Sequence, residues 1–390
     1  MTEHTERRRW WTLGVLCLGV LMIVLDTTIV NVALPSIKAD LRLPDTTLVW
    51  VVNAYMLTFG GSLLLGGRLG DLYGHRRLFL AGLALFTGAS LACGLAGTAV
   101  VLVVARAAQG LGAALVSAIS LSLIMNLFTE PHDRAKAMGV YGFVCSAGGS
   151  LGVLLGGALV DQFGWHSIFL VNVPIGLAVA VLCGVLVPAS SDAHRRQGLD
   201  VPGALAITAS LMLAVYAVVG GNEAGWTSPR TLGLLAVAAA LLAGFIAIEA
   251  RVRAPLMPLA LFRHRRLAAS NVAGVLWAAA MFAWFFLSAL YMQLVLGYGP
   301  MQVGLAFLPA NLVMGAFSLG LSARVVMRFG IRKPFGVGLA MAALGLALFA
   351  RAPVDGRFVV DVLPGMTLLG IGGGLAFNPL LLAAMGDVEP

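Results

Sequence analysis

The sequence predicts an all-α, polytopic membrane protein, and three observations support this. Of the 390 residues, 60% are hydrophobic and only 11% are charged, whereas a soluble domain carries about a quarter charged residues. Apolar runs of roughly 18 to 25 residues, the length that crosses a bilayer as a helix, recur along the whole chain. The basic residues gather in the short segments between these runs. Most of the chain must therefore be solvated by lipid.

The apolar runs predict about twelve membrane spans. Six form a first block, two follow a polar break at 190–200, and four follow a basic linker at 251–266. This spacing predicts three parts: a six-helix bundle at 1–190, two inserted helices with a linker at 191–266, and a partial bundle at 267–390. The expected spans are residues 10–34, 49–67, 78–98, 99–125, 136–160, 166–188, 201–220, 231–250, 267–293, 301–323, 334–350 and 359–383.

The distribution of Lys and Arg predicts the orientation. A cytoplasmic N-terminus places most of the 25 basic residues on the cytoplasmic side, as the positive-inside rule requires. We therefore expect a multi-pass protein of the cell (inner) membrane. The net charge of +8 is explained better by this orientation than by a nucleic-acid partner, because the basic residues do not share one face. The four cysteines lie in apolar segments without paired spacing, so no metal site and no cofactor are expected.

Residues 66–77 read GGRLGDLYGHRR and lie between two apolar runs. Glycines let two helix ends and a turn approach closely, and the charged residues can form a local ion network. The pattern resembles motif A, the cytoplasmic loop signature of the major facilitator superfamily of secondary transporters. Basic and glycine-rich loops also occur in unrelated membrane proteins. The resemblance implies a conformational gate formed by Gly67, Arg68, Gly70, Asp71, Gly74, Arg76 and Arg77.

An internal repeat agrees with this resemblance. Residues 324–333, RVVMRFGIRK, overlay residues 68–77 without a gap and match at the glycine and at the basic pairs. Met327 stands in the place of Asp71. A weaker echo sets the run GLGAAL at 110–115 against GIGGGL at 370–375. The chain thus contains two related halves, of which the second lacks the acidic residue of the first.

Asp26 and Arg106 are charged residues within apolar runs. An ionised side chain in a bilayer is costly unless it is paired or faces water, which makes both residues functional candidates. Counting 1.5 Å per residue puts Asp26 about 22 Å from the cytoplasmic face and Arg106 about 10 Å from the outer face, at nearly one level. A purely structural ion pair remains the alternative. Gln109, one turn from Arg106, and Asn31 are candidate supporting groups.

Three further runs resemble signatures of the fourteen-helix drug:proton antiporters. Residues 25–35, LDTTIVNVALP, resemble their first-helix motif, and residues 106–112, RAAQGLG, resemble motif B, whose arginine the resemblance assigns to proton coupling. Residues 148–157, GGSLGVLLGG, resemble the antiporter motif C, with Val153 where the family usually has proline. Small residues every fourth position also serve plain helix packing. The packing candidates are Gly148, Gly152, Gly156 and Gly157.

The resemblance implies a major facilitator fold with two helix bundles and two extra central helices. Fourteen spans would be needed, so the sequence is expected to be C-terminally truncated. A natural twelve-helix protein, in which the two inserted helices are miscounted, is the alternative. The expected function is proton-coupled efflux of hydrophobic or cationic compounds by alternating access, carried out by a monomer that binds small-molecule substrates and protons. A proton symporter of a small metabolite and a non-transporting membrane sensor are the alternatives. No ATP-binding or hydrolase motif occurs, and no enzymatic activity is expected.

Overall fold

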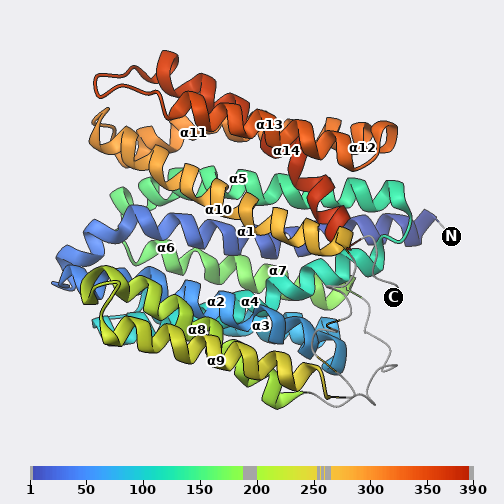
Figure 1. Cartoon of the computed structure of the whole chain (residues 1–390), viewed down its shortest axis with the longest axis horizontal. Coiled ribbons are helices and arrows are strands. Elements are labelled where there is room, and N and C mark those ends of the chain that lie inside the picture. The colour runs from blue at the N-terminus through green and yellow to red at the C-terminus, as the bar shows by residue number, and fades with distance from the viewer. Residues whose placement is uncertain (1–2, 188–199, 253–254, 256–258, 260–264, 386–390) are drawn as a thin grey trace. The chain divides into compact units, whose positions relative to one another are not determined.

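The computed structural model describes residues 3–187, 200–252, 255, 259 and 265–385, and every regular element in this part of the chain is a helix (Figure 1). Eleven helices among the described residues are long and apolar enough to cross a membrane, and Met301–Ala316 is a shorter apolar helix. Each span expected from the sequence coincides with one of these segments. The prediction of an all-α polytopic membrane protein with about twelve helices is confirmed.

The elements follow the chain in a regular order. They are α1 (Glu3–Asp40), α2 (Asp45–Tyr73), α3 (His75–Gly94), α4 (Ala99–Leu127), α5 (Pro131–Phe163), α6 (Ser167–Leu170), α7 (Asn172–Leu186), α8 (Val201–Ala224), α9 (Pro229–Glu249), α10 (Arg265–Leu294), α11 (Pro300–Ala316), η2 (Phe317–Ser322), α12 (Ala323–Phe329), α13 (Arg332–Phe349), η3 (Phe358–Val362) and α14 (Leu363–Met385).

Three expected spans are not one continuous α-helix. The span expected at 359–383 begins in the π-helical element η3 and continues as α14. The span expected at 166–188 breaks between α6 and α7, where Pro174 has no N–H to donate to the carbonyl four residues earlier. The span expected at 301–323 contains η2, a stretch of π-helix. Wide turns of this kind leave backbone carbonyls open for side chains and often mark functional sites.

The helices group into two compact units that do not follow chain order. Unit 1 consists of Met1–Ile23, Ala33–Leu123 and Phe163–Ala260, and unit 2 of Val24–Val32, Ile124–Gln162 and Leu261–Pro390. The middle of α1 therefore belongs with α5 and the later helices. The domain boundaries predicted at 190 and 266 remain predictions, and residue 190 lies outside the described residues.

The two inserted helices, α8 and α9, pack within unit 1. A Cβ on Gly61 of α2 would lie 3.1 Å from Met212 of α8, and the Ser210 hydroxyl of α8 donates to Ala238 O of α9 at 2.8 Å. Asp200 and Ser228 cap the N-termini of α8 and α9 through their side-chain oxygens, which satisfies backbone N–H groups that a helix start leaves open.

The internal repeat predicted from the sequence appears in the backbone of both units. Gly74, between α2 and α3, has φ 92°, and Gly330, between α12 and α13, has φ 75°. The overlay of the two basic loops pairs these glycines. Both turns need the left-handed region, which glycine adopts without a Cβ penalty.

Close helix contacts repeat in the same way. A Cβ on Gly112 of α4 would lie 2.8 Å from Gly82 O of α3, and a Cβ on Gly372 of α14 would lie 2.6 Å from Gly338 O of α13. Small residues allow backbones to approach in this manner. A matching pair follows, in which Gly110 abuts Tyr55 O and Gly370 abuts Ala310 O. The two halves thus share one packing scaffold.

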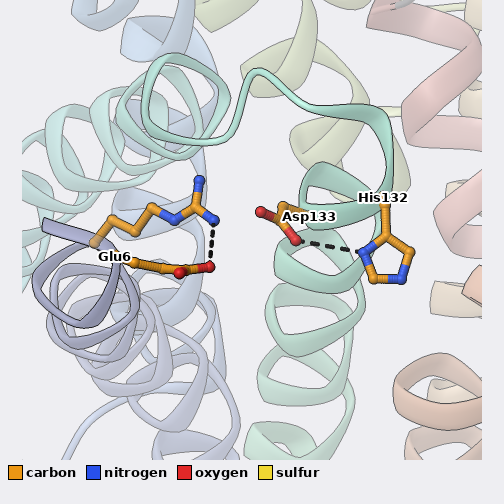
Figure 2. Close-up of polar contacts among 4 residues, drawn as sticks. Glu6, His132 and Asp133 are labelled. Atoms are coloured by element: carbon orange, nitrogen blue, oxygen red, sulfur yellow. Dashed lines mark hydrogen bonds and ion pairs between the residues drawn. The ribbon is translucent and has the colours of Figure 1, made fainter. Parts of the chain in front are cut away.

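Ion pairs on the helix starts add little to this scaffold. Glu6 pairs with Arg9 at 3.2 Å in α1, and His132 pairs with Asp133 at 3.4 Å in the first turn of α5. Figure 2 labels Glu6, His132 and Asp133 and marks both contacts with dashed lines. Exposed pairs of this kind contribute about 0 to 1 kcal/mol. Helix packing through glycine and apolar side chains therefore dominates the described structure.

Candidate functional site: buried charges and the first hairpin

Arg106 is fully buried in α4 and is held by specific contacts in unit 1. Its Nε donates to Val51 O of α2 at 2.9 Å, and its Nη1 donates to Gln109 Oε1 at 2.7 Å. The guanidinium also lies 4.3 Å from the centre of the Tyr55 ring. Backbone, amide and aromatic partners together compensate the charge for its removal from water.

Gln109 extends these contacts into a polar network. Its Nε2 donates to the Ser90 hydroxyl of α3 at 2.7 Å, and Asn172 Nδ2 of α7 reaches the same oxygen at 3.4 Å. Gln109 was predicted from its position one turn from Arg106, whereas Ser90 and Asn172 were missed. An asparagine in an apolar run was the one available signal for Asn172; nothing in the sequence marks Ser90.

The glycines of the RAAQGLG run position α4. Gly110 abuts Tyr55 O and Thr58 Oγ1 of α2, and the Thr58 hydroxyl donates to Ala107 O at 2.7 Å. Gly112 abuts α3. Because no side chain separates these backbones, the turn of α4 that carries Arg106 is fixed on two sides.

Asp26 lies in the segment of α1 that belongs to unit 2, and its side chain is 1% exposed. The glycines predicted for helix packing hold this segment. A Cβ on Gly152 of α5 would lie 3.0 Å from Leu25 O, and one on Gly156 would lie 2.8 Å from the Ile29 side chain. The run that resembles motif C therefore packs directly against the part of α1 that carries the buried carboxyl group.

Other members of the predicted set lie differently. Asn31 is exposed and its amide donates to Thr27 O at 3.2 Å, so it does not share the buried environment of Asp26. A Cβ on Gly157 would lie 3.7 Å from Met301, an ordinary contact. Gly148 is buried. The helix α5 runs without interruption past Val153, as expected where no proline occurs.

The hairpin between α2 and α3 is the predicted gate. The Gly74 N–H donates to Gly70 O at 3.0 Å and closes α2. Asp71 pairs with His75 Nε2 at 3.4 Å, one turn away, and its side chain is 52% exposed. His75 thus occupies the basic position beside the carboxylate. A Cβ on Gly67 would meet open space, so this glycine is not required for close packing.

Basic residues of the gate also cap a neighbouring helix. Arg76 donates to Gly184 O near the C-terminus of α7, while Arg8 donates to Leu186 O at 3.2 Å and to Val185 O at 3.3 Å. The last carbonyls of a helix lack intrahelical partners and carry partial negative charge. These arginines therefore tie α1, α3 and α7 together, while Arg68 is half-buried and Arg77 exposed.

A second buried polar cluster, in unit 2, was missed. Asn378 Nδ2 of α14 donates to Ser318 O of η2 at 3.0 Å, and the Ser318 hydroxyl donates to Gly139 O of α5 at 3.3 Å. A Cβ on Gly142 would lie 2.7 Å from Ser318 Oγ. The π-helical turn and a bare glycine thus let three helices join through polar groups. Sequence spacing does not predict a π-helical turn.

Comparison with known proteins identifies the family. The profile described as Major Facilitator Superfamily matches residues 16–390. The chain belongs to the major facilitator superfamily. This family and the relatives named below indicate a transporter rather than an enzyme, one that spans the membrane several times and acts on small molecules.

The transporter resembles several proteins named for antibiotic resistance or export. It is 39% identical to the puromycin resistance protein pur8 of Streptomyces alboniger over 100% of this chain and 77% of that protein. It is 39% identical to the cephamycin export protein CmcT of Amycolatopsis lactamdurans, covering 96% and 77%. The tetracenomycin C resistance and export protein of Streptomyces glaucescens is 36% identical, covering 94% and 67%.

Solved structures share the fold. The proton:xylose symporter XylE gives a TM-score of 0.64 at 17% identity, covering 99% of this transporter and 83% of that chain. The human organic anion transporter MFSD10 gives a TM-score of 0.61 at 14% identity, covering 96% and 92%. At this identity the likeness establishes the fold alone.

Proposed function

We propose that this transporter exports hydrophobic or cationic compounds in exchange for protons, by alternating access between two helix bundles. Relatives named for resistance to, or export of, puromycin, cephamycin and tetracenomycin C support export of antibiotic-like compounds. The motif runs support assignment to the fourteen-helix drug:proton antiporter branch. The protein acts as a monomer in the cell (inner) membrane with its N-terminus in the cytoplasm.

The burial of Asp26 is the observation that carries the proton-coupling proposal. A carboxyl group is the cheapest buried charge to neutralise, because it needs only to bind a proton. Asp26 is 1% exposed on an apolar helix, beside α5 glycines that permit close contact. Opening or closing of this contact changes the access of water, and therefore of protons, to the carboxyl group. The carboxyl group can thereby link proton binding to conformation.

Arg106 supplies the fixed charge in this proposal. Its partners in unit 1 include two hydrogen-bond acceptors and the rings of Tyr55 and Phe169, so its position is set by the protein rather than by a ligand. A fixed positive charge favours ionised carboxyl groups and disfavours cations within its range. A proton and a cationic compound would then compete for binding to the same carboxyl group.

The hairpin at 66–77 gates the cytoplasmic side in the same proposal. Asp71 has a basic neighbour in His75 and no acidic counterpart at Met327. We assign to Asp71 a clamp that holds the cytoplasmic side shut in the outward-facing state, through a basic residue or a helix N-terminus of the second half.

Proton symport of a small metabolite is the second candidate. The absence of proline at Val153, in an uninterrupted α5, departs from the antiporter motif and favours this alternative. Antiport and symport move protons in opposite directions relative to substrate, so one flux measurement separates them.

Asp26→Asn tests the coupling proposal, since asparagine keeps the shape and removes the titratable proton. We expect bacteria that lack their own exporters to gain resistance to ethidium and puromycin from the wild-type protein and to lose it with Asp26→Asn. The cation ethidium should be affected more than neutral compounds. Membrane yield and elution as a single species should be unchanged.

Asp161→Asn is the matched control, because Asp161 is exposed near the end of α5 and undergoes the same chemical change. It should leave resistance at the wild-type level. Full proton-coupled transport by the purified Asp26→Asn variant would reject the assignment of Asp26.

A further inference from the structure

The aromatic residues of α10 fall on two different faces. Phe282 is 71% exposed and Phe286 is 64% exposed, so these rings lie on the exposed face of α10. Trp284 is 1% exposed. An apolar run of this kind does not by itself separate exposed aromatic residues from buried ones.

The inner face of α10 forms an aromatic cluster with α11, consisting of Trp284, Phe285 and Phe307. The Trp284 and Phe307 rings meet edge to face at 5.7 Å, and Phe285 stacks on Phe307 at 5.1 Å. Trp284 lies about 17 residues into a span of 28, close to mid-membrane, the depth at which transporter substrate sites occur.

Two polar groups on this face have unused hydrogen-bonding capacity. Among the described residues, Trp284 Nε1 and Ser288 Oγ are buried and lack a hydrogen-bond partner. Trp284 and Ser288 are one helical turn apart, which places them on the same face. Buried Trp N–H groups usually find a partner, and an unpaired one costs free energy. A ligand that supplies an acceptor would recover this free energy.

We propose that the aromatic cluster, with Trp284 Nε1 and Ser288 Oγ, is a substrate subsite for neutral, planar aromatic compounds that carry a carbonyl oxygen. The indole N–H can only donate, so the ligand must accept. A planar ring would take the place of the half-buried Phe285 ring, which stacks on Phe307 at 5.1 Å in this structure, after the Phe285 side chain turns aside. This proposal rests on the proposed export function and names one class of its substrates.

The test compares 9-fluorenone with fluorene, two planar molecules that differ in one carbonyl oxygen. Binding to the purified full chain is measured by equilibrium dialysis in detergent. For Trp284→Phe we expect the affinity for 9-fluorenone to fall roughly fivefold, the loss of one neutral hydrogen bond, with fluorene within twofold of wild type. Ser288→Ala should give a smaller loss for 9-fluorenone alone. Phe282→Leu, on the exposed face of α10, should change neither.

Two results would overturn the subsite. If Trp284→Phe leaves both affinities unchanged and raises the thermal midpoint of the empty protein, the indole is only an unsatisfied core group. If Trp284→Phe lowers the affinities for 9-fluorenone and fluorene equally, Trp284 contributes ring packing and no hydrogen bond. If Trp284→Phe does not fold, two other measurements decide. The proposal is rejected if the wild-type protein binds 9-fluorenone and fluorene with equal affinity and Ser288→Ala leaves the 9-fluorenone affinity unchanged. Because the assay measures binding and not transport, the result for this subsite does not depend on whether the proposed export function is correct.

Discussion

The two repeats of this transporter share a scaffold and differ in what it holds. In unit 1, Gly110 and Gly112 pack α4 against α2 and α3, and in unit 2, Gly370 and Gly372 pack α14 against α11 and α13. Four residues before the first glycine of each run stand Arg106 in one repeat and Met366 in the other. Met366 lies in an apolar core with Leu369. The glycine contacts therefore serve packing in both repeats, and the charge is an addition to one.

This difference suggests a division of roles. The charge in unit 1 has a prepared set of partners in Val51 O, Gln109 and Tyr55. The equivalent place in unit 2 lies in an apolar core that includes Met366, and Trp284 Nε1 and Ser288 Oγ on α10 are buried polar groups of the same unit. We infer that fixed charge belongs to the first repeat, and that the second contributes apolar surface with a few hydrogen-bonding groups.

The largest effect is expected from moving the charge to the wrong repeat. Met366→Arg buries a guanidinium among apolar residues, where nothing is arranged to bind it. A charge at the centre of a membrane helix costs about 3 kcal/mol or more. We expect loss of the monodisperse peak in size-exclusion chromatography. Met366→Leu, which nearly conserves volume, should keep it, and a well-folded Met366→Arg would show that unit 2 tolerates charge as unit 1 does.

Removing the charge from the first repeat should have a smaller effect on folding and a large effect on transport. Arg106→Met removes the guanidinium that donates to Val51 O and to Gln109 Oε1, at a cost of about 1 to 3 kcal/mol. Proton-driven uptake of ethidium into inside-out vesicles should fall roughly 10- to 100-fold. This fall corresponds to a coupling free energy of about 1 to 3 kcal/mol, the usual range. Arg106→Lys should not restore it, because lysine lacks the planar fork. Wild-type proton dependence in either variant would contradict this role.

The smallest effect concerns the two hairpins, which share a left-handed glycine and differ at Asp71 and Met327. Asp71→Asn should shift the population toward the inward-facing state by about 1 to 3 kcal/mol. Its exposed pair with His75 contributes at most about 1 kcal/mol to stability. Spin-label distances across the cytoplasmic face should therefore change while substrate binding in detergent survives. Unchanged distances would mean that the loop only fixes the orientation of the protein in the membrane through its basic residues.

Much of this architecture could be predicted from the sequence because membrane spans are long and apolar. The repeat, the α5 glycines and the Arg106–Gln109 pair also follow from helical spacing. Residues joined across helices could not be predicted. Ser90 meets Gln109, and Asn172 meets Ser90, only through tertiary packing, and the Ser318–Asn378 contact depends on a π-helical turn. The exposed and buried faces of α10 could not be predicted either, because both carry aromatic residues.

Exchange of protons for substrate is the central claim, and proton flux in inside-out vesicles measures it most directly. With no gradient imposed, ethidium is added to vesicles that contain the wild-type protein, and the pH of the medium is followed. Antiport predicts that protons leave the vesicles as ethidium enters, so the medium acidifies, and that Asp26→Asn abolishes the signal. Alkalinisation of the medium would establish symport, and ethidium entry without any proton movement would contradict proton coupling altogether.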